Sequence, residues 1–205
     1  MHKLIIFSLA FLGFIFVTEA KKVKGQILYL NDTVDVIFNI PVKFLGQEPN
    51  YERLQQKVIY YDSNGVKRVL KPDDAKEIRF RFGHDEIRML SRENTLGIGN
   101  IFSSNSNIFL RIEIDGKLKL FYCYLTHSGM YNPSTGMAPG ASYSVEKFVL
   151  QRGERTLKIP ADLNFKNDMI RYFYDCPELS QKIERKEFRK SDVSAIVKFY
   201  NQHCN

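Results

Sequence analysis

The sequence predicts an α+β fold: an antiparallel β-rich body of several hairpins, sheet or barrel-like, followed by about three C-terminal helices. Three observations predict it. Short apolar runs alternate with polar residues, turn residues separate these runs, and the apolar spacing becomes helical after residue 160. Runs of strands followed by runs of helices are typical of this class. With 44% apolar residues in 205, the chain can bury a core without crosslinks.

Residues 1–20 are predicted to be a secretory signal peptide. A basic N-terminus ending at Lys3 precedes an apolar run from Leu4 to Val17, and small residues end at Ala20. The run has 14 residues, fewer than the ~18 that a membrane-spanning helix needs. We therefore expect an exported chain, periplasmic, cell-surface or secreted, with no transmembrane helix after cleavage. Residues 21–205 should form a single domain, with the β-rich body at 21–160 and the helical region at 161–205.

Turn residues predict the first two hairpins. A two-residue turn at Asn31 and Asp32 pairs Tyr29 with Val34 and Ile27 with Val36. Asn64 and Gly65 are the preferred pair for a type I′ turn, which sets Tyr60 across from Val69 and Asp62 across from Lys67.

Two further hairpins follow. A three-residue loop at Asp115–Lys117 matches apolar residues better than a two-residue loop, because it sets Ile112 opposite Leu120 and Leu110 opposite Tyr122. A fourth hairpin turns at Arg152–Glu154 and joins the segments 144–153 and 154–160.

Helical spacing predicts three C-terminal helices, at 164–174, 177–185 and 191–202, with Pro177 in a first turn and Ser191 as an N-cap. If the last two pack antiparallel, Cys176 lies beside Cys204. Export permits disulfides, so we predict a Cys176–Cys204 bridge. Cys123 lies in "KLKLFYCYL", whose alternation indicates a strand covered on both faces, and is predicted to be a buried hydrophobic residue. A catalytic pair with His127 would have to span about 13 Å along that strand.

Several motifs together resemble a group of uncharacterised exported proteins of Bacteroidetes bacteria. They are a Gly25-x-Ile27 strand with "NDT" at its turn, "LKPDDAKEIRF" after a hairpin, "DCPEL", and a final "YNQHC". The resemblance covers most of the mature chain, although Val36 stands where that group has a glycine. It implies export and a β-rich body with C-terminal helices. It implies no activity, cofactor or catalytic residue.

Two segments are candidate contact surfaces. The net charge of +7 either serves solubility alone or indicates an anionic partner, and for an exported chain an anionic envelope component or an envelope protein is a more fitting partner than nucleic acid. The loop 126–144, rich in glycine, proline and serine, is either a binding segment or disordered, and contains Met130, Tyr131 and Met137. The second segment is either a basic patch or a solvated face with helical ion pairs, and contains Lys182, Arg185, Lys186, Arg189 and Lys190.

Motifs for chemistry are few. The sequence contains no HExxH, GxSxG, P-loop or paired CxxC, and "GIGNIF" lacks the third glycine of a dinucleotide fingerprint. His84, Asp85 and Glu86 are either metal ligands or a polar turn between two strands, and Asn31-Asp32-Thr33 is either a glycosylation sequon or a turn. We therefore predict no cofactor.

The sequence favours an exported binding or structural module of the bacterial envelope. The alternative is an envelope hydrolase that uses His84, Asp85 or His127 around a sheet cleft. Whether the protein is an enzyme stays open at this point.

Overall fold

One antiparallel sheet organises the molecule in the computed structural model, which describes residues 19–43, 48–97, 106–128 and 142–204. The strand order is β4-β3-β2-β1-β5-β6-β7-β8-β9, so the sheet is open, with β4 and β9 at its edges. The strands are β1 (Ala20–Leu28), β2 (Thr33–Pro41), β3 (Val58–Tyr61), β4 (Lys67–Leu70), β5 (Glu77–Phe82), β6 (Asp85–Glu93), β7 (Asn107–Ile114), β8 (Leu118–Ser128) and β9 (Ser142–Arg152).

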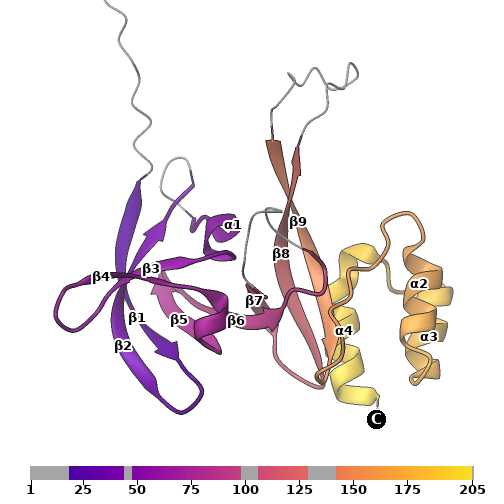
Figure 1. Ribbon diagram of the computed structural model, residues 1–205. Coiled ribbons are helices and arrows are strands. Elements are labelled where there is room, and N and C mark those ends of the chain that lie inside the picture. The colour runs from indigo at the N-terminus through magenta and orange to yellow at the C-terminus, as the bar shows by residue number, and fades with distance from the viewer. Residues whose placement is uncertain (1–18, 44–47, 98–105, 129–141, 205) are drawn as a thin grey trace, which may run out of the picture.

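The helices confirm the predicted α+β class. Figure 1 shows α2, α3 and α4 gathered beside β8 and β9, while the short α1 lies between the two halves of the sheet. Their bounds are α1 (Tyr51–Leu54), α2 (Phe165–Tyr172), α3 (Pro177–Glu184) and α4 (Val193–His203), with 3-10 turns η1 (Pro72–Asp74) and η2 (Lys190–Asp192). Among the described residues no helix is long and apolar enough to span a bilayer.

Three apolar clusters fill the space around the sheet. The first joins β1, β2, β3, β5 and β6 to α1, around the fully buried Phe38. The second lies between the helices and β8 and β9, around Leu118 and Leu120. The third covers the opposite face of β6 to β9, where Cys123 is fully buried, as predicted. Both faces of β6–β9 are therefore covered, because alternate side chains along these strands pack into different clusters.

The first two hairpins form with registers that differ from the prediction. In the first, Ile27 pairs with Val34 and Gly25 with Val36, because the turn takes four residues: the Tyr29 amide donates to the Asp32 carbonyl at 2.8 Å. A Cβ at Gly25 would lie 2.3 Å from the Arg79 carbonyl oxygen, so only glycine fits there.

In the second hairpin Ile59 pairs with Val69 and Tyr60 with Arg68, one residue away from the predicted register. The cause is Asp62, whose carboxylate accepts the amides of Asn64 (3.0 Å) and Val66 (2.9 Å) and so lengthens the loop. A shift of one residue reverses the faces of β4 relative to β3.

The third hairpin forms, but its register shifts inside strand β7. A bulge between Ile112 and Ile114 sets Ile112 opposite Phe121 and Arg111 opposite Tyr122, which corrects the predicted register by one residue. The prediction of a fourth hairpin is wrong beyond its turn. In place of a second strand, the described segment after β9 forms a single bridge, between Leu150 and Lys158. The chain leaves the sheet there because Leu157 turns inward to pack on the third cluster.

The C-terminal helices match the predicted ones closely, except that Asp192, not Ser191, is the N-cap of α4. Cys176 and Cys204 are bridged, with Cα atoms 5.5 Å apart, which confirms the predicted pair. The two end motifs also contact each other, because the Tyr200 hydroxyl donates to Asp175 at 2.7 Å. Asn201 holds α4 to the sheet: its side chain accepts the Leu118 amide at 2.8 Å and donates to the Leu118 carbonyl at 2.9 Å. "DCPEL" and "YNQHC" are therefore structural motifs.

Candidate functional site

A polar cleft of about 810 Å³ opens where the first apolar cluster meets the long β8–β9 hairpin. Charged and aromatic side chains dominate its lining. They come from β1, the segment before α1, α1 itself, the β5–β6 turn and strands β7, β8 and β9: Lys21, Lys43, Glu48, Tyr51, Phe82, His84, Asp85, Arg111, Tyr124 and Glu146.

Arg111 lines this cleft and lies between two tyrosine rings. Its guanidinium carbon is 4.7 Å from the centre of the Tyr51 ring and 4.8 Å from that of Tyr122. The side chain is 24% exposed, and its buried Nε has no hydrogen-bond partner. A buried donor without a partner is rare in folded proteins and costs free energy. The stacked rings hold the guanidinium in one orientation and leave part of its hydrogen-bonding capacity unused.

The position of Tyr51 depends on a buried glutamine at the end of α1. Gln55 is 2% exposed, and its amide donates to the Tyr124 carbonyl at 3.0 Å while its oxygen accepts the Tyr124 amide at 2.5 Å. The Gln55 carbonyl also accepts the Phe109 amide at 3.1 Å. A helix of one turn has little stability of its own, so these bonds to β7 and β8 fix α1 above Arg111.

A tyrosine pair and a carboxylate form the wall beside Arg111. The rings of Tyr51 and Tyr124 are stacked with centres 6.1 Å apart, and the Tyr124 hydroxyl donates to Glu146. Burial first, and then the bond to Glu146, raise the pKa of Tyr124 above its ordinary value, so the phenol stays protonated. Burial likewise raises the pKa of Tyr51. Both tyrosines are therefore neutral hydrogen-bonding groups at physiological pH.

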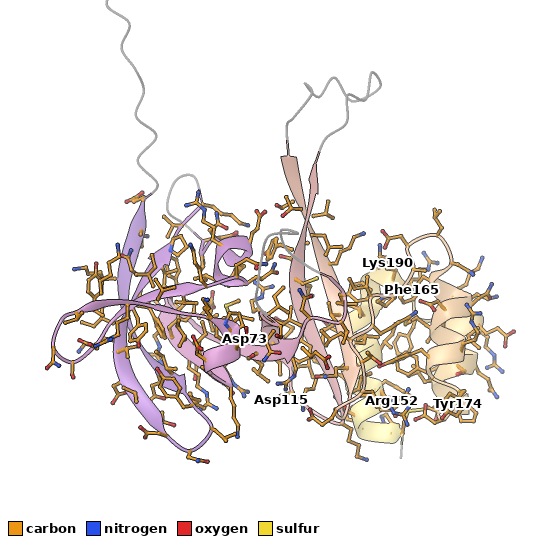
Figure 2. The ribbon with its side chains drawn as sticks, viewed as in Figure 1. Asp73, Asp115, Arg152, Phe165, Tyr174 and Lys190 are labelled. Atoms are coloured by element: carbon orange, nitrogen blue, oxygen red, sulfur yellow. A yellow bond between two sulfur atoms is a disulfide. The ribbon has the colours of Figure 1, made fainter. Side chains whose placement is uncertain are left out.

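Arg152 offers an internal comparison for Arg111. Its guanidinium also lies between two tyrosines, 4.9 Å from the Tyr172 ring centre and 5.0 Å from that of Tyr200, and its Nε is likewise buried without a partner. Arg152, however, forms an ion pair with Asp175 at 2.9 Å and donates to the Tyr172 carbonyl at 2.6 Å. Figure 2 shows it at the end of β9 next to the helices. Arg152 is thus a structural cation with a partner of its own.

The charge on Arg111 is less fully neutralised than the charge on Arg152. Burial works against its charge, but the Tyr51 hydroxyl and the nearby Glu146 more than offset this and raise its pKa, so it stays cationic. Among the described residues its one carboxylate contact is Glu146, at 4.0 Å, and Glu146 already accepts the Tyr124 hydroxyl. Lys43 is paired with Glu48 at 2.9 Å on the cleft rim. Arg111 is therefore the cation of the lining that is best placed for an added anionic group.

His84 and Asp85 reach the same cleft from the β5–β6 turn. They follow Gly83, whose φ of 64° permits the tight turn that the sequence predicts at this point. Among the described residues no group of three histidine, cysteine, aspartate or glutamate side chains could hold a metal ion. Asn31 and Asp32 lie in the first turn.

The predicted basic patch is partly neutralised. Lys182 pairs with Glu187 at 3.3 Å and lies 5.6 Å from the centre of the Phe199 ring, while Lys190 pairs with Asp162 at 2.6 Å. Figure 2 shows Lys190 at the helical end of the molecule. Arg185, Lys186 and Arg189 are exposed. Met130, Tyr131 and Met137 lie outside the described residues, as does the His127 side chain.

Sequence reasoning missed Arg111, Tyr51 and Gln55. Arg111 was hidden by the register: with Ile112 opposite Leu120, it would face the third cluster and not Tyr122. Tyr51 and Gln55 belong to a helix of four residues and its C-cap, which carries no detectable apolar period. The one available signal was an arginine inside the apolar run "IFLRIEI".

Comparison of the chain with models of known protein families, with curated proteins and with solved structures finds no match in any of the three. The geometry of the cleft is therefore the basis on which a function is assigned.

Proposed function

We propose that the protein is an exported binding module of the bacterial envelope whose cleft holds a small polar ligand with one anionic group. The observation that carries this proposal is the guanidinium of Arg111, fixed between two tyrosines and with its nearest carboxylate at 4.0 Å. A guanidinium held in this way pairs well with a carboxylate, because its planar donors are already oriented.

The rest of the lining favours a polyhydroxyl ligand. Glu48, Asp85 and Glu146 line the cleft with carboxylates, which are hydrogen-bond acceptors, and the neutral phenol of Tyr124 belongs to the same lining. Three carboxylates would repel a polyanion but suit hydroxyl groups, so the fitting class is a monosaccharide- or disaccharide-sized acid such as a uronic acid.

Isothermal titration of the mature protein with D-glucuronate, and with D-glucose as its neutral counterpart, tests this. We expect glucuronate to bind and glucose to bind at least about tenfold more weakly, since a charged hydrogen bond contributes roughly 1.5–3 kcal/mol. Arg111→Gln should remove this preference. Arg152→Gln is the matched control, because it removes the other stacked guanidinium: it should lower the melting temperature and leave glucuronate affinity unchanged. Equal affinity for both sugars, or an unchanged preference in Arg111→Gln, would refute the proposal.

An envelope hydrolase acting in the same cleft is the second candidate. It is supported by the placement of His84 and Asp85 in the lining. This candidate requires turnover of a saccharide or ester substrate by the purified protein. In the double variant His84→Ala, Asp85→Ala, turnover should be abolished while glucuronate binding at Arg111 survives. Retained turnover in this double variant would exclude the two residues as the catalytic pair.

A further inference from the structure

The outer face of the first four strands is an open surface with aliphatic side chains between cations. Strand pairing sets Lys24 of β1 next to Ile37 of β2, Ile37 next to Tyr61 of β3, and Tyr61 next to Lys67 of β4. Paired residues share a face, so these four form one row across the sheet. Gly25 pairs with Phe80 of β5. In this antiparallel register the next residue, Arg81, lies opposite Lys24, and it therefore extends the row.

A second row runs beside the first. Lys22 pairs with Asn39, Asn39 with Ile59, and Ile59 with Val69. We call the two rows together the outer sheet face. Its members are Lys22, Lys24, Ile37, Asn39, Ile59, Tyr61, Lys67, Val69 and Arg81.

This face carries exposed aliphatic groups that the fold leaves uncovered. Ile37 is 43% exposed and Val69 54% exposed, whereas Val36 and Phe38 on the opposite face of β2 are buried in the first cluster. Figure 1 shows α1 on the inner side of these strands, and no described helix covers their outer side. Ile59 pairs directly with Val69 and is the diagonal neighbour of Ile37, so the three side chains form one contiguous apolar patch, which indicates a contact surface.

The cations on the face are available. Within the part of the chain that the structure describes, Lys24, Lys67 and Arg81 have no ion-pair partner. By contrast, the neighbouring Arg79 and Arg88 are both held by Glu77, at 2.5 and 2.7 Å. Among the described residues, two carboxylates without an ion pair belong to the same face: Asp35, which accepts from Gln26 at 2.9 Å, and Glu86, which lies opposite Arg81 in the strand register. Glu77 is neutralised by Arg79 and Arg88. Asp62, beside Lys24 and Tyr61, is neutralised by Arg68 at 2.7 Å. Four cations against two carboxylates leave the outer sheet face positive.

From this combination we infer that the outer sheet face binds an anionic phospholipid bilayer surface. Lysine and arginine near such a surface are attracted by lipid phosphates, and aliphatic side chains between them enter the boundary with the acyl chains. An acidic polysaccharide would be attracted by the same cations but would leave Ile37 and Val69 uncovered, because it has no acyl region to receive them. This surface is separate from the Arg111 cleft, so the inference does not depend on the proposed ligand.

Co-sedimentation of the mature protein with phosphatidylglycerol-containing vesicles and with pure phosphatidylcholine vesicles tests the inference. We expect binding to the anionic vesicles only, weakened by salt. Lys24→Glu with Lys67→Glu should lower the partition coefficient by at least about 25-fold, because each cation near an anionic surface is worth about fivefold. Ile37→Ser with Val69→Ser should also lower it, without changing its salt dependence.

The matched control makes the same charge change at the helical end. Arg185→Glu with Lys186→Glu should leave the partition coefficient within about twofold, and so should Arg111→Gln. The melting temperature of each variant shows that it is folded. Binding without preference for anionic vesicles would overturn the inference. So would an equal loss in Arg185→Glu with Lys186→Glu, or binding to soluble polygalacturonate in place of vesicles.

Discussion

Burial, more than any nearby charge, sets the ionisation of the Cys123 thiol. Cys123 is 0% exposed, and burial raises the pKa of its thiol from 9.0 to about 12. It belongs to the third cluster together with Phe121 and Val149, where a thiol acts as a small hydrophobic group.

The Cys123 thiol should therefore be inert in the folded protein. Thiol titration at pH about 8 should find no reactive group before unfolding and one after it, because only the thiolate reacts. The unfolded chain ionises this thiol first, so Cys123 lowers the free energy of unfolding as pH rises from 9.0 to about 12. Cys123→Ala should lack this pH dependence. Rapid reaction of the native thiol would contradict the buried position.

Gly25 is required by packing and not by a turn. A Cβ there would meet the Arg79 carbonyl oxygen at 2.3 Å and the Phe38 ring at 2.7 Å. Gly25→Ala should lower the free energy of unfolding by about 3 kcal/mol, at the upper end of the range for overpacking. Gly153→Ala is the control: it has open space but a φ of 55°, and should cost about 1 kcal/mol. Urea denaturation measures both, and equal losses would show that steric packing at Gly25 is not the cause.

The four-residue helix α1 supplies Tyr51 to the cleft, and its C-cap Gln55 fixes the position of this helix. Replacing Gln55 by alanine leaves the Tyr124 amide and carbonyl without their partners and should cost about 1–3 kcal/mol. Because Tyr51 then loses its fixed position over Arg111, glucuronate affinity should fall as well. Gln181→Ala, on an exposed site of α3, should change neither quantity. If Gln55→Ala loses stability but keeps full affinity, α1 is not what orients the site.

The C-terminal helices are joined by one covalent and several polar contacts. The Cys176–Cys204 bridge spans a sequence separation of 28, and its removal should cost roughly 3–4 kcal/mol in the chain-entropy model. In the Cys176→Ala, Cys204→Ala double variant, the rate of hydrogen exchange should rise relative to the bridged protein. The rise should be larger in α3 and α4 than in β1–β6. A peptide map of the non-reduced protein with both cysteines free would contradict this account.

Element types were predictable from the sequence, whereas their registers were not. Alternation and helical stripes are local signals, so the strands of the sheet and α2 to α4 were predicted, whereas the strand predicted at 154–160 was wrong and α1 was missed. The antiparallel packing expected of the last two helices predicted the Cys176–Cys204 pair. Register depends on side chains that bond to the turn backbone, such as Asp62, and on the bulge at Ile112, neither of which changes the apolar pattern. Because the site residue Arg111 takes its place from that bulge, the site could not be predicted either.

At the scale of the whole molecule, the sheet separates two surfaces with different chemistry. The cleft over Arg111 lies on the side of α1, and the outer sheet face lies on the opposite side of β1–β4. In the proposed account, an anionic membrane contacts the outer sheet face while the cleft on the opposite side stays open to a ligand. The Arg111→Gln and Lys24→Glu/Lys67→Glu variants separate the two roles, because each should remove one kind of binding and keep the other.

The most direct test of the central claim is a ¹H–¹⁵N spectrum of the arginine Nε–H groups during titration with D-glucuronate. Arg111→Gln and Arg152→Gln spectra assign the two stacked guanidinium groups. The proposal predicts that the Arg111 signal shifts progressively with glucuronate and not with D-glucose, while the Arg152 signal stays in place, since its partner is Asp175. An Arg111 signal that does not move, or that moves equally with glucose, would contradict the assignment of this cleft as an anion-binding site.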